Sequence, residues 1–123
     1  MSTAIACLLI AALLPYLTVA ICKTQKGYNN HAPRDWGAQL QGLQRRAFAA
    51  HLNHFEAFPA FAAGVLVAGM RGVDETLVAR LAVAFIVLRV AYVLAYLADQ
   101  PLLRSLLWTA AFACPLWLIA AAI

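Results

Sequence analysis

Four long apolar segments run along the chain, separated by stretches rich in polar residues and turn formers. They cover roughly residues 3–22, 44–70, 75–97 and 102–123. Each is long enough to cross a bilayer, because the hydrocarbon core takes about 20 residues of helix. The pattern therefore predicts four transmembrane helices that form one membrane domain over residues 1–123.

The connections between these segments differ in length. The first contains KTQKGYNNHAPRDWGAQLQG, a mixture of charge, Gly, Asn and Pro that does not continue a helix. The second and third cover only residues 71–74 and 98–101. Short links force neighbouring helices to run antiparallel, so we expect an all-α integral membrane protein built as an antiparallel four-helix bundle.

Composition supports a membrane location. Of the 123 residues, 65% are hydrophobic and 11% are charged, and the mean hydropathy is +0.81. Soluble domains average roughly 45–50% apolar and about 25% charged residues. The first segment carries no charge and no basic leader, so we interpret it as a retained helix and not as a cleaved signal peptide.

The net charge of +4 does not indicate nucleic-acid binding, because the basic residues gather around the first connection. These residues are Lys23, Lys26, Arg34, Arg45 and Arg46, and Arg104 follows the third connection. The positive-inside rule then predicts that the first and third connections are cytoplasmic and that both termini lie outside.

Metal and disulfide chemistry find little support. Cys7, Cys22 and Cys114 belong to separate segments and form no CxxC pair. His51 and His54 lack the HExxH spacing that places two ligands on one helix face. We therefore expect no metal site and no disulfide, and we interpret both histidines as helix-packing or interfacial groups.

Polar side chains interrupt the second and third segments at helical spacing. Arg46, Asn53 and Glu56 share one stripe of the second segment, and Arg89, Tyr92 and Tyr96 share one of the third. A charge at mid-membrane costs at least ~2.5 to 3.5 kcal/mol, so these groups need partners, water or a ligand. Glu56 and Arg89 lie at similar depths, which predicts an ion pair within one subunit or between subunits.

Such a pair could do no more than neutralise its charges and fix helix register. It leaves a surplus of polar groups on the cytoplasmic side, namely Arg46, Asn53, Tyr92, Tyr96, Arg104 and Ser105. Guanidinium groups match carboxylates, and phenols or amides satisfy peptide groups. We therefore expect a cavity for an anionic, peptide-like ligand.

A stripe of small residues accompanies the polar cluster in the second segment. Ala60, Gly64 and Ala68 recur every four positions. Small residues at this spacing let a neighbouring helix approach closely in lipid, although an alanine-rich helix also meets the pattern by chance.

The ordered set of polar residues resembles the MAPEG family, the membrane-associated proteins of eicosanoid and glutathione metabolism, which includes microsomal glutathione transferases. The resemblance covers Arg45 to Ser105 and rests on these residues: Arg46, AHLN at 50–53, Glu56, Pro59, Arg89, Tyr92, Tyr96 and the Arg104-Ser105 pair. The segments NNHAPRDW and HLNHFEAFPAF are more similar to the bacterial branch of the family than to its eicosanoid enzymes. This similarity implies a location in the bacterial inner membrane.

The resemblance implies a homotrimer that binds glutathione, as cosubstrate, between subunits near the cytoplasmic side. Arg46, Asn53, Glu56, Arg89, Tyr92 and Tyr96 would bind or frame glutathione. Arg104 would stand beside the sulfur, and Ser105 would be a hydroxyl donor. Many members carry an acidic residue at positions 45 and 54 and an arginine at position 49, where this chain has Arg45, His54 and Ala49.

Three functions follow as alternatives. The first is a glutathione-dependent transferase or peroxidase acting on lipophilic electrophiles or lipid hydroperoxides that enter from the bilayer. The second is a noncatalytic protein that binds a lipid or small amphiphile in the same interhelical groove. The third is a small transporter or proton-relay subunit, suggested only by the intramembrane charges Glu56 and Arg89.

Overall fold

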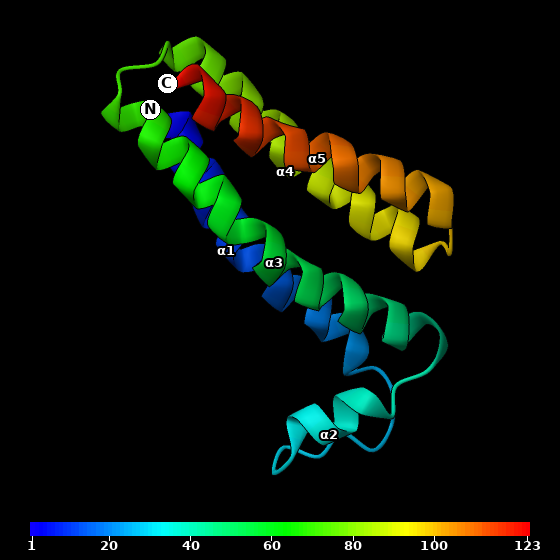
Figure 1. Cartoon of the computed structure of the whole chain (residues 1–123). Helices are drawn as coiled ribbons and strands as arrows, with labels where there is room; N and C mark the ends of the chain where they lie inside the picture. The colour runs from blue at the N-terminus through cyan, green and yellow to red at the C-terminus, as the bar shows by residue number, and fades with distance from the viewer.

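The computed structural model, which describes residues 1–123, contains four long helices and one short helix. The long helices are α1 (Ser2–Cys22), α3 (Gly42–Met70), α4 (Glu75–Leu97) and α5 (Pro101–Ala121). Their ends fall within two residues of the predicted segments. Consecutive long helices run in opposite directions, with both chain termini at one end and α2 at the other (Figure 1). The predicted antiparallel helical bundle is confirmed.

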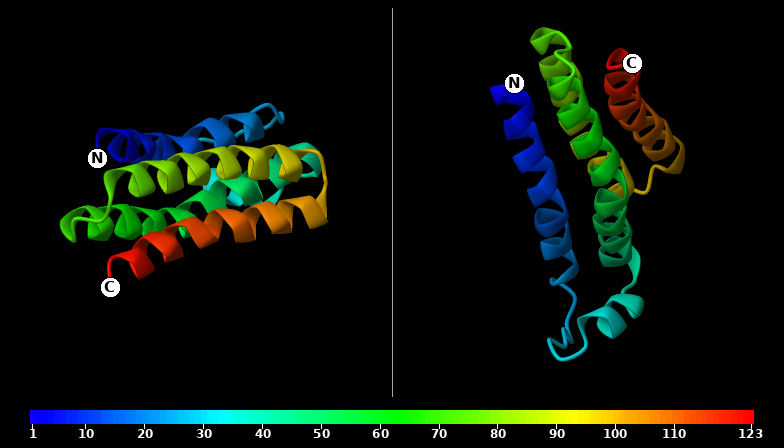
Figure 2. Two further views of the ribbon diagram at one scale, coloured as in Figure 1. Left: turned by 90° about the horizontal axis from the view of Figure 1, so that it is seen from above. Right: turned by 60° about the vertical axis from the view of Figure 1, so that its left-hand side comes forward.

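Three of these helices, α1, α4 and α5, are long and apolar enough to cross a membrane. The fourth, α3, is the longest at 29 residues and carries Arg45, Arg46 and Glu56 along its length. These charges lower its hydropathy, although it runs alongside the other three (Figure 2). The helix that is least suited to lipid by composition therefore carries three of the eight candidate site residues, Arg46, Asn53 and Glu56.

The short helix α2 (Pro33–Ala38) was not expected within the first connection. Pro33 stands in its first turn, where the missing N–H of proline costs no hydrogen bond, and Asp35 suits the positive end of the helix. Trp36 is buried against Cys22 and Ala47, at the ends of α1 and α3. Packing of the indole against these helices explains a helix of only six residues that composition alone does not indicate.

The bundle is held by close contact between helices. α1 packs along α3, α4 packs along α5, and α3 also contacts α5. Phe61 of α3 stacks on Phe85 of α4 with ring centroids 3.9 Å apart. At Gly64, an added Cβ would lie 3.0 Å from the carbonyl oxygen of Pro115 on α5, so the two backbones approach each other closely. This confirms the close approach predicted from the small-residue stripe.

The turn between α4 and α5 positions the candidate site. Asp99 adopts a positive φ of 57°, and the backbone N–H of Gln100 donates to the carbonyl of Ala95 over 3.0 Å. α5 then begins at Pro101, whose fixed φ suits a first helical position. This tight reversal places Arg104, in the first turn of α5, beside Tyr96 in the last turn of α4.

Candidate functional site

A buried guanidinium lies at the centre of the polar cluster. Arg89 of α4 is 1% exposed and has no carboxylate within ion-pair distance. Its Nη1 donates to Asn53 Oδ1 over 2.9 Å, and its Nη2 donates to His54 Nδ1 over 3.2 Å. Both acceptors belong to α3, so the arginine ties α4 to α3 through neutral groups.

The cluster extends from Arg89 in two directions. On one side, Asn53 Nδ2 donates to Glu56 Oε2 over 2.7 Å. On the other, His54 Nε2 lies 3.2 Å from the hydroxyl of Thr18 on α1, and that hydroxyl donates to the carbonyl of Leu14 over 2.8 Å. The result is one hydrogen-bonded network that crosses three helices.

The predicted direct ion pair between Glu56 and Arg89 is wrong within one protomer. Asn53 lies between the two groups and bonds to both of them. Glu56 is exposed, whereas the guanidinium points into the bundle toward His54. Equal depth in the membrane therefore did not bring the two charges together, because they leave their helices in different directions.

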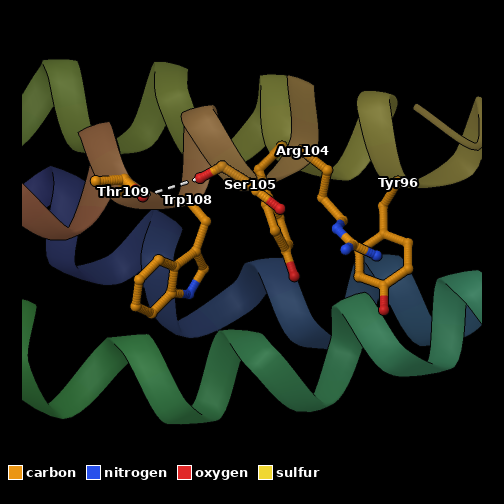
Figure 3. Close-up of a pocket in the computed structure, with 6 residues that line it drawn as sticks. Tyr96, Arg104, Ser105, Trp108 and Thr109 are labelled. Carbon is orange, nitrogen blue, oxygen red and sulfur yellow. Dashed lines mark hydrogen bonds between the residues drawn. The ribbon is translucent and has the colours of Figure 1, made fainter. Parts of the chain in front are cut away.

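A second group of predicted residues lines a pocket between α4 and α5. The pocket has a volume of about 290 Å³, is open on one side, and is lined by Tyr92, Tyr96, Arg104, Ser105, Trp108 and Thr109. Figure 3 shows the side chains of Tyr96, Arg104 and Trp108 projecting from α4 and α5 in the direction of α3. Four of the eight predicted site residues, Tyr92, Tyr96, Arg104 and Ser105, thus line this pocket.

Tyr92 joins the pocket to the buried network. The Arg89 guanidinium carbon lies 4.4 Å from the centre of the Tyr92 ring, and Tyr92 packs edge-to-face against Tyr96. Tyr92 is buried, so its position depends on the groups behind it. The network and the pocket are therefore two parts of one polar region.

Arg104 is the cation of the pocket. Its guanidinium lies over the Tyr96 ring, 4.6 Å from the centroid, and no carboxylate lies within ion-pair distance of it. Stacking on an aromatic face holds the planar group in place without neutralising it. Its positive charge is available to an anion in the pocket.

Ser105 and Arg46 are both already engaged. The Ser105 hydroxyl donates to the carbonyl of Pro101 over 3.0 Å, so it would have to rotate before it could donate to a ligand. Arg46 donates to the carbonyl of Leu97 at the end of α4, and its Nη1 lies 3.7 Å from Asp99. Arg46 is not among the residues that line the pocket.

Four residues of the region were not identified as site residues from the sequence. Trp108 and Thr109 line the pocket, and each follows a predicted residue of α5 by four positions, a spacing that could have revealed them. His54 and Thr18 are buried at 3% and 4% exposure and complete the network. For these two, no spacing rule within one helix gives the contact, because it crosses from α3 to α1.

Chemically, the region combines a free guanidinium, two phenols and an indole around an open pocket, with a half-buried amide, that of Asn53, in the adjoining network. This donor set fits a peptide-like anion with an apolar neighbour. No group of three histidine, cysteine, aspartate or glutamate side chains is arranged to hold a metal ion. The three cysteines are free and buried.

Comparison with known proteins adds one finding. A family model described as the MAPEG family matches residues 3–123. No curated protein and no solved structure matches the chain.

Proposed function

Because the chain belongs to the MAPEG family, whose members are mostly glutathione-dependent membrane enzymes, we propose that it is a membrane-embedded glutathione transferase or peroxidase. Its second substrate would be a lipophilic electrophile or a lipid hydroperoxide. The pocket between α4 and α5 would hold the reacting sulfur.

The observation that carries this proposal is the environment of Arg104. Its guanidinium is held against Tyr96, faces an open pocket and has no acidic partner. A neighbouring cation favours the thiolate over the thiol, and the thiolate is the nucleophile. Arg104 would therefore raise the reactive fraction of bound glutathione at neutral pH.

The chemistry requires little else from the protein. In conjugation, the thiolate attacks the electrophilic carbon, a carbon–sulfur bond forms, and the leaving group departs with its electron pair. In peroxide reduction, the thiolate attacks oxygen, the O–O bond breaks, and the alkoxide takes a proton to give an alcohol. The resulting sulfenic acid condenses with a second glutathione to give a disulfide and water.

The remaining predicted residues would bind the rest of the tripeptide. Asn53, Glu56 and Arg89 present an amide, a carboxylate and a guanidinium in one network next to Tyr92. Because the pocket is open on one side, a second protomer in a homotrimer would supply the missing wall. We assign the roles of binding or framing glutathione to Arg46, Asn53, Glu56, Arg89, Tyr92 and Tyr96, and the roles at the sulfur to Arg104 and Ser105. The buried Arg89 would act through Asn53 and Tyr92.

Titration of detergent-purified protein with glutathione, by calorimetry and by thermal shift, tests the proposal. We expect saturable binding and an ultraviolet absorbance from bound thiolate at neutral pH. S-methylglutathione is the matched control, because it keeps the peptide but cannot ionise at sulfur. Absence of saturable glutathione binding would contradict the proposal.

A second candidate function is noncatalytic binding of a lipid or small amphiphile in the same groove. Two observations favour it: Arg46 is engaged by Leu97 and Asp99, and position 49, an arginine in many family members, is alanine here. Both reduce the number of cations free to hold a tripeptide. Saturable binding of an amphiphile, together with no detectable binding of glutathione in the same titrations, would support this candidate over the first.

A further inference from the structure

The buried network gives a role to His54, a residue that does not line the pocket between α4 and α5. We infer that neutral His54, carrying its hydrogen on Nε2, is the positioning residue that holds the Arg89 guanidinium against Asn53 and Tyr92. The effect on ligand binding rests on the proposed function, whereas the assignment of the hydrogen does not.

The donors and acceptors around His54 fix its protonation. A guanidinium can only donate, so His54 Nδ1, 3.2 Å from Arg89 Nη2, must be the bare acceptor nitrogen. The hydrogen therefore lies on Nε2, which faces the Thr18 oxygen at 3.2 Å. The Thr18 hydroxyl already donates to Leu14, so its oxygen is free to accept. Every hydrogen bond in this part of the network is satisfied only with a neutral ring.

His51, three residues earlier, has the opposite arrangement. Its Nδ1 lies 2.7 Å from the carbonyl oxygen of Pro15, which can only accept. His51 must therefore carry a hydrogen on Nδ1. The two histidines of α3 therefore differ at Nδ1, which carries a hydrogen in His51 and none in His54, and this difference can be measured within one sample.

His54 is well placed to control Arg89. The guanidinium has only two hydrogen-bond partners, Asn53 and His54, and its Nε atom has none. Removing His54 leaves two contacts to set its orientation, the bond to Asn53 and the face of Tyr92. Asn53 is oriented in turn, because its Oδ1 must accept from Arg89 while its Nδ2 donates to Glu56. An acceptor at position 54 thus orders two residues assigned to the ligand.

Three variants separate positioning from general stability. His54→Asn keeps an acceptor oxygen near the place of Nδ1, whereas His54→Leu removes it. Val65→Ala is the matched control, because Val65 is fully buried on the same helix and lies in the apolar core. The measurements are the melting temperature in detergent, the dissociation constant for glutathione, and nitrogen NMR of histidine-labelled protein.

We expect His54→Leu to weaken glutathione binding about ten-fold or more, the range for losing one hydrogen bond to a charged group. His54→Asn should restore binding to within about three-fold of the parent, less than half a decade of affinity. Val65→Ala should lower the melting temperature without changing affinity. Turnover at saturating glutathione should fall less than affinity in His54→Leu, because Arg104 is untouched.

Two results would overturn the inference. One is a loss of glutathione affinity that is equal in His54→Asn and His54→Leu, or a loss in Val65→Ala that equals the loss in His54→Leu when the two variants have the same melting temperature. The other is an NMR spectrum in which His54, assigned by its absence from His54→Asn, carries hydrogen on Nδ1. If the parent protein does not bind glutathione, the proposed function fails, and the NMR assignment with the relative stabilities of the Asn and Leu variants still decides the role of His54.

Discussion

At the scale of single residues, Arg89 of α4 and Arg104 of α5 are held in different ways. Arg89 is buried and bonded to neutral acceptors, whereas Arg104 is partly exposed and stacked on Tyr96. A buried group is sensitive to the loss of any partner, while a stacked, solvated group is not. We therefore expect substitutions of Arg89 to act on stability and on ligand binding, and substitutions of Arg104 to act on chemistry.

Arg104→Ala should raise the apparent pKa of the thiol of bound glutathione and lower turnover, because each pKa unit corresponds to ~1.4 kcal/mol of thiolate stabilisation. Thiolate absorbance against pH and conjugation of a generic aromatic electrophile measure the two effects. Asn53→Ala is the reciprocal variant and should weaken binding while leaving that thiol pKa nearly unchanged. An unchanged titration and unchanged turnover in Arg104→Ala would remove this residue from the mechanism.

Arg89→Met should lower the free energy of unfolding by about 2 to 4 kcal/mol, because Asn53 Oδ1 and His54 Nδ1 lose their donor inside the bundle. Glu56→Gln should cost less than about 1 kcal/mol, because Glu56 is exposed and an amide oxygen can still accept from Asn53. Thermal unfolding in detergent compares the two. Equal destabilisation would indicate that Glu56 meets a cation of another subunit.

The sequence predicted which residues belong to the site better than it predicted which of them contact one another. Tyr92, Tyr96, Arg104 and Ser105 come together because helical spacing and a short turn are both visible in the sequence. The partner of Arg89 was predicted wrongly, because it depends on how each helix is rotated about its axis. Depth along the membrane does not determine that rotation, so Asn53 and His54 took the place expected for Glu56.

At the scale of helices, the bounds of the four long elements followed from apolar length alone, within two residues. The short α2 did not, because Trp36 packing on α1 and α3 is a tertiary contact. The contact between α3 and α5 could be predicted only in part from the sequence. A stripe of small residues indicates that some helix approaches closely, but only the fold identifies α5 as that helix.

Substitution of Gly64 tests this contact. In Gly64→Ala the new Cβ would lie 3.0 Å from the Pro115 carbonyl oxygen and 3.2 Å from its Cα, and backbone atoms cannot swing aside. We expect a loss of about 1 to 3 kcal/mol, the usual cost of overpacking, and a larger loss for Gly64→Leu. The melting temperature in detergent is the measurement. Ala63→Leu, at an exposed neighbouring position, is the control and should have little effect.

At the scale of the whole molecule, both termini lie at one end of the bundle and the α4–α5 turn lies at the other (Figure 1). The distribution of Lys and Arg predicts that the end with the turn is cytoplasmic. Reporter fusions should therefore place position 26 in the cytoplasm and position 123 outside. A cytoplasmic signal from position 123 would contradict this orientation and the entry of glutathione from the cytoplasm.

The open side of the pocket leads to a prediction about assembly. One protomer supplies only α4 and α5 side chains to the pocket wall, so a neighbouring copy is needed to enclose a tripeptide. Crosslinking and mass measurement in detergent should give three copies, as the family resemblance implies. A stable monomer that binds glutathione with full affinity would show that no second copy contributes.

The buried cysteines have a consequence for the proposed thiol chemistry. Cys7, Cys22 and Cys114 are at most 6% exposed, and the Cys22 thiol donates to the carbonyl of Gln44. Thiolate character and exposure together govern attack by peroxides and exchange with disulfides. With no accessible thiol of its own, the protein would not form mixed disulfides with glutathione, so the proposed chemistry would leave its own cysteines unmodified.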